Sequence, residues 1–176
     1  PFIALYEVHL PNPGYGQRPD NLQLTGGMDL KYGLSDAFTL DMTLVPDFGQ
    51  VQSDNVVLNL SPFEIQFQER RPFFTEGVEI FNASGVFYSR RVGGRPIDYY
   101  KPYDELEEGE RVIQNPEQSQ LINAFKVSGR TLKGTGLGIF NGLSAPMYAT
   151  VSDSATKEKR QILTQPLTNY SVAVVD

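Results

Sequence analysis

Two neighbouring segments of the chain alternate regularly between apolar and polar residues. The apolar residues are Leu22, Leu24, Met28, Leu30 and Tyr32 in the first segment and Phe38, Leu40, Met42 and Leu44 in the second. An alternation of period two places the apolar side chains on one face of a strand and the polar side chains on the other. Each segment is about 9–11 residues long, which is enough to cross a bilayer as a tilted strand. The pattern predicts membrane-crossing β-strands, with a long hairpin in a soluble sheet as the alternative.

In a membrane barrel, the two faces of these strands would meet different surroundings. The side chains expected to contact lipid are Leu22, Leu24, Leu30, Leu40, Met42 and Leu44, and those expected to face the lumen are Asp29, Lys31, Asp41 and Thr43.

The composition of the 176 residues narrows the classes of function further. The net charge is −6, which disfavours nucleic acid as a partner because its phosphates repel an acidic chain. The chain has no Cys and a single His, His9, which excludes disulfides, thiolate chemistry and multi-histidine metal sites. We therefore expect no cofactor and no metal. The sequence also lacks a run of about 18 apolar residues, which excludes a transmembrane helix.

The remaining sequence is typical of further short strands separated by turns. Strands are expected at residues 2–10, 86–92, 122–128, 135–143, 147–151 and 167–175, and no helix is expected. Residues 95–120 contain an acidic run from Asp104 to Glu110 and are expected to form a solvent-exposed loop. Because both ends of the chain lie in strand-like runs, residues 1–176 are interpreted as a single partial β-barrel domain, a fragment of a longer chain.

Several longer motifs resemble one family of envelope proteins. Residues 29–35 read DLKYGLS, residues 38–51 read FTLDMTLVPDFGQV, and residues 59–64 read NLSPFE. Residues 69–77 read ERRPFFTEG, residues 87–93 read FYSRRVG, residues 121–129 read LINAFKVSG, and residues 166–170 read PLTNY. Together they resemble the outer-membrane β-barrel domain of unknown function that follows a family-nine-like carbohydrate-binding domain in Gram-negative envelope proteins.

This resemblance implies an all-β fold made of the antiparallel strands of a transmembrane β-barrel. It implies a structural or transport role, and it supplies no established reaction. Outer-membrane lipid or other envelope proteins are the implied partners, and the outer membrane is the implied location, with an extracellular location as the alternative. The carbohydrate-binding domain of such proteins has no counterpart in these residues, so no sugar-binding residue is implied.

The densest group of charged residues lies in and beside the motif at residues 69–77. It comprises Glu64, Glu69, Arg70, Arg71 and Glu76, and Arg90 and Arg91 are expected to join it. Because arginine pairs with carboxylates through two parallel hydrogen bonds, we predict a structural charged network in the barrel wall or lumen, with no catalytic residue. A charged constriction in a pore is the second interpretation. A glycan-acting enzyme that uses Glu64, Glu69 or Glu76 is the third.

A piece of a barrel taken alone has unpaired strand edges, which leads to an alternative fold. Residues 3–6, 55–60 and 171–175 combine little charge with high β-propensity, as cross-β segments do. The alternative is therefore a cross-β fibril of the cleaved fragment, self-assembled into an amyloid-like extracellular fibre. Antiparallel hairpins within one chain would favour the barrel, and identical residues stacked about 4.8 Å apart would favour the fibre.

Overall fold

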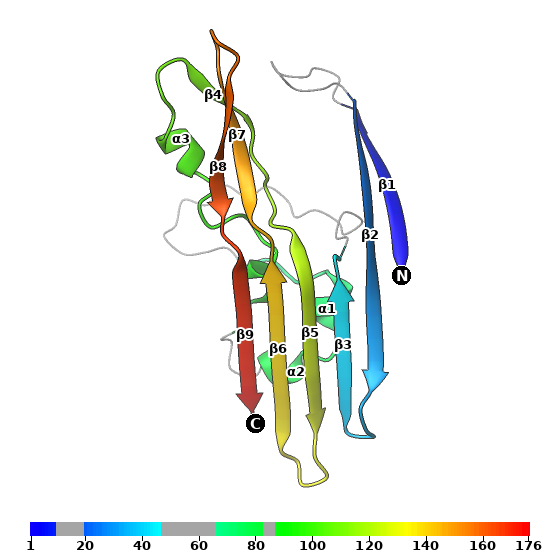
Figure 1. Cartoon of the computed structure of the whole chain (residues 1–176). Helices are drawn as coiled ribbons and strands as arrows, with labels where there is room; N and C mark the ends of the chain where they lie inside the picture. Colours follow the sequence, from blue (N-terminus) through cyan, green and yellow to red (C-terminus); the bar gives the residue numbers. More distant parts are fainter. Residues whose placement is uncertain (10–19, 47–65, 83–86) are drawn as a thin grey trace.

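A computed structural model describes residues 1–9, 20–46, 66–82 and 87–176 of the chain, and these residues form antiparallel β-sheets with a few short helices (Figure 1). The all-β, antiparallel class expected from the sequence is confirmed. Glu64 and residues 55–60, singled out in the sequence, lie outside the described residues.

The larger sheet has six strands in the order β1-β2-β3-β5-β6-β9, and every neighbouring pair is antiparallel. Its strands are β1 (Phe2–His9), β2 (Asp20–Gly33), β3 (Phe38–Leu44), β5 (Leu121–Arg130), β6 (Gly136–Ser144) and β9 (Thr168–Val175). The described strands form an open sheet with β1 and β9 at its edges, so they do not themselves close into a barrel.

A smaller sheet of three strands continues the β6–β9 end of the larger one (Figure 1). It consists of β4 (Glu110–Gln114), β7 (Met147–Asp153) and β8 (Lys159–Gln165), in the order β4-β7-β8. Pro146 separates β6 from β7, and Pro166 separates β8 from β9. Because proline has no N–H to donate to a ladder, the two prolines mark the point where one sheet ends and the other begins.

The larger sheet has one apolar face that the described chain leaves exposed, called here the outer face. Directly paired residues of antiparallel strands share a face, and the rows Leu30–Met42–Phe125 and Tyr32–Leu40–Val127–Ile139 both lie on this one. Leu24 is 71% exposed and Ile139 is 54% exposed. The alternation in β2 and β3 predicted from the sequence is confirmed, because Asp41 and Thr43 lie on the opposite, inner face and are buried.

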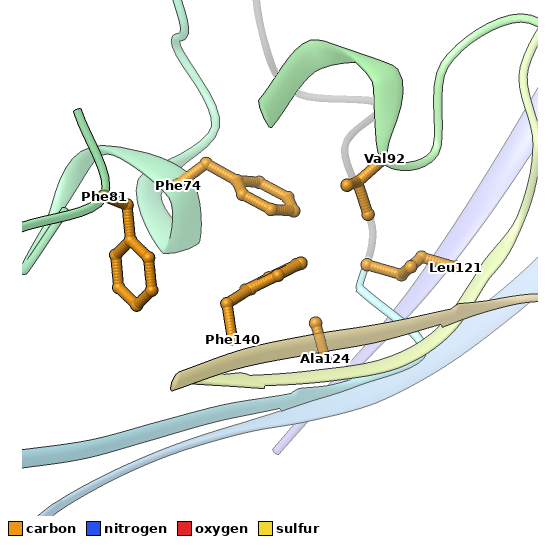
Figure 2. Close-up of a cluster of buried hydrophobic side chains, with 6 residues drawn as sticks. All are labelled: Phe74, Phe81, Val92, Leu121, Ala124 and Phe140. Carbon is orange, nitrogen blue, oxygen red and sulfur yellow. The ribbon is translucent and has the colours of Figure 1, made fainter. Parts of the chain in front are cut away.

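Short helices cover the inner face of the larger sheet. They belong to residues 66–82 and 87–92, called here the inner segment, which contains α1 (Pro72–Thr75), α2 (Glu79–Asn82) and the 3-10 helix η1 (Ser89–Arg91). The buried apolar core lies between this segment and the strands, and Figure 2 shows its members: Phe74, Phe81, Val92, Leu121, Ala124 and Phe140. Among the helices of the described ranges, none has the length and apolar composition to cross a membrane.

Glycine at position 138 of β6 allows the inner segment to approach the sheet closely. A Cβ atom at Gly138 would lie 3.0 Å from the Phe81 ring and 3.0 Å from Ile80, both of them buried in α2. The small residue therefore fixes how close α2 lies to the strands.

Three expectations about local structure are wrong. No helix is expected from the sequence, whereas the inner segment contains the short helices α1 and α2. Residues 87–92 contain η1 in place of a strand, because the carbonyls of Ser89 and Val92 accept hydrogen bonds from the Arg71 side chain. Residues 95–120 are more than a solvent loop, since they contain α3 (Lys101–Asp104) and β4. Glu110 at the start of β4 pairs with Arg160 of β8 through hydrogen bonds of 2.7 and 2.6 Å, a contact that no local pattern predicts.

Candidate functional site

Charges of alternating sign cross three strands of the inner face. Lys31 of β2, Asp41 of β3 and Lys126 of β5 are direct neighbours in the register of the sheet. The Asp41 carboxylate lies 3.9 Å from the Lys31 ammonium and 3.7 Å from the Lys126 ammonium. Together with Glu76 of the inner segment, these residues are called here the inner charged cluster.

Lys126 is the most deeply buried member of the inner charged cluster, with a side chain only 2% exposed. Its ammonium donates hydrogen bonds to the backbone carbonyls of Phe73 and Glu76, and it lies 4.6 Å from the centre of the Phe73 ring. A buried ammonium is tolerated only when acceptors replace its lost water, and the α1 region supplies two of them. Lys126 therefore fastens the inner segment to the part of the larger sheet formed by β3 and β5.

Glu76 provides a second, more exposed link between the inner segment and the sheet. Its carboxylate accepts a hydrogen bond of 2.7 Å from the Lys31 ammonium, and both side chains are largely exposed. This hydrogen bond and the charge of Lys31 lower the pKa of the Glu76 carboxyl below its ordinary value. Glu76 is therefore ionised at neutral pH.

Arg71 and Glu69 form a compact ion pair inside the inner segment. The guanidinium donates hydrogen bonds of 2.9 and 2.7 Å to the two Glu69 carboxylate oxygens. It also donates to the carbonyls of Val92 at 2.6 Å and Ser89 at 2.8 Å, and lies 4.2 Å from the centre of the Phe74 ring. Arg71 is only 5% exposed, so this ion pair is buried between η1 and the α1 region and holds the two together.

The environment of Glu69 keeps its carboxyl ionised. Burial opposes the charge, but hydrogen bonds from Arg71 and from the Ser89 hydroxyl, the latter at 2.6 Å, outweigh it. The pKa of Glu69 is therefore lower than that of an ordinary glutamate.

The residues predicted to form one charged network are divided between two places in the structure. Glu69 and Arg71 lie together, whereas Glu76 pairs with Lys31 on β2. Arg70 is exposed next to the ion pair, Arg90 is half-buried in η1, and the Arg91 guanidinium lies 5.8 Å from the centre of the Tyr88 ring.

Lys126 is the member of the site that sequence reasoning missed. It stands between the outer-facing Phe125 and Val127 of β5, at a position where alternation requires an inner-facing side chain. A lysine at an inner position between two apolar outer-facing residues was the available signal.

An open cavity of about 350 Å³ lies beside the inner charged cluster. Its lining includes Asp29, Lys31, Asp41, Thr43, Phe73 and Glu76. Thr43 is completely buried, and its hydroxyl finds no hydrogen-bond partner among the residues that the structure describes. Within the same residues, no group of three or more His, Cys, Asp or Glu is placed to hold a metal ion. The cavity thus offers a mixture of cationic and anionic groups.

Fold and site together define an all-β protein in which a short helical segment is fastened by buried charges to one face of an antiparallel sheet. The chain belongs to the family described as a domain of unknown function (DUF5916), whose sequence model matches residues 1–176. No curated protein matches the chain, and no solved structure matches it.

Proposed function

We propose that the larger sheet is part of the wall of an outer-membrane β-barrel with a structural or transport role. The observation that carries the proposal is the outer face, on which apolar side chains of β2, β3, β5 and β6 lie next to one another with no covering layer among the residues that the structure describes. Leu22, Leu24 and Ile139 are each more than half exposed there, at 67%, 71% and 54%. Soluble proteins rarely expose a continuous apolar surface of this extent, whereas a barrel wall presents one to lipid.

The inner face supports the same proposal by its contrast with the outer face. The inner charged cluster and the inner segment lie on the side that would face the lumen, where barrels place polar groups and plugging elements. In this arrangement the cluster and the adjoining cavity would line any path through the barrel lumen. The resemblance to an outer-membrane domain in Gram-negative envelope proteins points in the same direction.

The antiparallel pairing within one chain favours a barrel wall over an amyloid-like fibre. Strands β2 and β3 form a hairpin, as do β5 and β6, and each residue pairs with a different residue of the same chain. In a cross-β fibre, identical segments of separate chains stack on one another.

A catalytic role is not part of the proposal. A glycosidase acid needs a raised pKa, whereas the pKa values of Glu69 and Glu76 are both lowered by their basic partners. Both carboxylates are better suited to holding the inner segment in place.

The test uses single cysteines as fluorescent labelling sites, because these 176 residues contain no native cysteine. Ile139→Cys on the outer face is compared with Leu132→Cys in the β5–β6 turn, where Leu132 is fully exposed. The labelled protein is reconstituted into phosphatidylcholine vesicles with brominated acyl chains. We expect strong quenching at position 139 and weaker quenching at position 132. Fluorescence at position 139 that is the same in brominated and unbrominated vesicles would overturn the proposal.

A further inference from the structure

A polar patch interrupts the outer face at one corner of the larger sheet. It consists of Asn123 on β5, Asn141 on β6, and Asn169 and Ser171 on β9, and is called here the asparagine patch. The Asn141 amide donates hydrogen bonds of 2.9 Å to the side-chain oxygens of both Asn169 and Ser171. The Ser171 hydroxyl donates to Asn169 at 2.8 Å. The patch lies at the end of the sheet next to the smaller sheet.

The apolar surface extends much further along β2 than along β6. Tyr32 and Ile139 lie in one row of the sheet, through Leu40 and Val127. From this row toward the asparagine patch, the next outer residue of β6 is already polar, namely Asn141. On β2, the outer residue Leu24 lies further along in the same direction and is still apolar. It pairs with Leu5 of β1.

The border between apolar and polar outer residues therefore crosses the strands obliquely. On β9 it falls between Ala173 and Ser171, and on β5 it falls between Phe125 and Asn123. On β3 the outer residues remain apolar as far as Leu44, which lies in the same row as Asn123. The border lies between the same two rows on β9 and β6 and moves further along the sheet from β6 to β5 and from β5 to β3, while on β6 the apolar Leu143 lies beyond it.

We infer that the strands cross the bilayer at a tilt, with the asparagine patch at the level of the lipid headgroups. Leu30 and Met28, which lie in the same two rows of the sheet on β2, are then in the hydrocarbon. This inference rests on the proposed function and adds which residues meet which layer of the lipid. Strands of membrane barrels are inclined by about 35–45°, so one membrane plane meets neighbouring strands at different residues. Exposed amides and hydroxyls match hydrated headgroups, whereas in hydrocarbon the donors and acceptors that the patch does not use internally would lack partners.

One row of the sheet gives a sharp test of the tilt. This row begins at Met28 on β2 and runs through Leu44, Asn123 and Leu143 to Asn169 on β9. Strands perpendicular to the membrane plane would place the two ends of this row at equal depth. With strands spaced about 4.8 Å apart and tilted by about 40°, the Met28 end lies about 12 Å deeper than the Asn169 end.

The experiment compares Met28→Cys with Asn169→Cys, each carrying the same fluorophore in vesicles brominated at different positions along the acyl chain. We expect position 28 to be quenched best by deep bromines and position 169 only by bromines near the headgroup. Equal depth at both positions, or a greater depth at position 169, would overturn the tilt and leave the proposed function intact. Quenching at neither position, in variants whose circular dichroism matches the parent protein, would overturn the proposed function itself and the tilt with it.

Discussion

Lys126 lies directly opposite Asp41 across the β3–β5 pair, with their charged atoms 3.7 Å apart, and its ammonium also donates to the carbonyls of Phe73 and Glu76. A single side chain therefore joins two strands of the larger sheet to the α1 region. Because the ammonium is buried, the ion pair with Asp41 and the two hydrogen bonds to carbonyls replace its hydration. Loss of any one of these contacts would leave the buried charge less well compensated.

The replacement Lys126→Met should loosen the inner segment. It leaves Asp41 buried beside fewer positive charges and removes the donor to two carbonyls, for which we expect a loss of about 3 kcal/mol in the free energy of unfolding. The measurement is urea unfolding, together with hydrogen exchange of residues 72–82. Lys31→Met is the matched control, and its effect should be much smaller because the Lys31–Glu76 pair is exposed. Equal losses in the two variants would contradict the fastening role of Lys126.

The replacement Arg71→Lys should weaken the contact between the α1 region and η1. A lysine keeps the charge but lacks the planar fork that reaches both Glu69 oxygens and the carbonyls of Ser89 and Val92. We expect a loss of about 2 kcal/mol, because buried acceptors are left without a donor. Faster hydrogen exchange at residues 89–92 should accompany it. Arg70→Lys, on the exposed neighbour, should have a smaller effect, and the idea fails if the two variants behave alike.

The apolar outer face could be predicted from the sequence, and the fastening of the inner segment could not. Alternation is a local property, so Leu30 and Met42 identify their face wherever the strands are placed. The contact of Lys126 with Asp41 depends on the pairing register of β3 and β5. These two strands are separated by a long stretch of sequence, so the register is not a local property. Likewise, Glu69 and Arg71 are close in sequence and form a pair, whereas the partner of Glu76 is Lys31 on a distant strand.

The stability contributed by Glu69 should depend on pH. Its pKa in the folded protein is lowered by Arg71 and Ser89, which outweigh the effect of burial, so the unfolded chain binds the proton more readily. The contribution is therefore complete above the ordinary glutamate pKa of about 4.3 and is lost as the pH falls through the lower, folded value. The free energy of unfolding of the parent protein and of Glu69→Gln should be measured between about pH 3 and pH 7. We expect the difference to shrink at the acidic end, and a difference that is constant across the range would contradict this account.

The close approach of α2 to β6 should make Gly138 intolerant of even one methyl group. In Gly138→Ala the new Cβ would lie 3.0 Å from the Phe81 ring, which is buried against Phe87 and cannot move away freely. Overpacking of this kind should lower the free energy of unfolding by about 1–3 kcal/mol. Gly33→Ala, at the end of β2, is the matched control because no atom lies within 4 Å of its new Cβ. Urea unfolding of both variants should show a loss at position 138 alone. A neutral Gly138→Ala would mean that α2 does not pack against β6 at this distance.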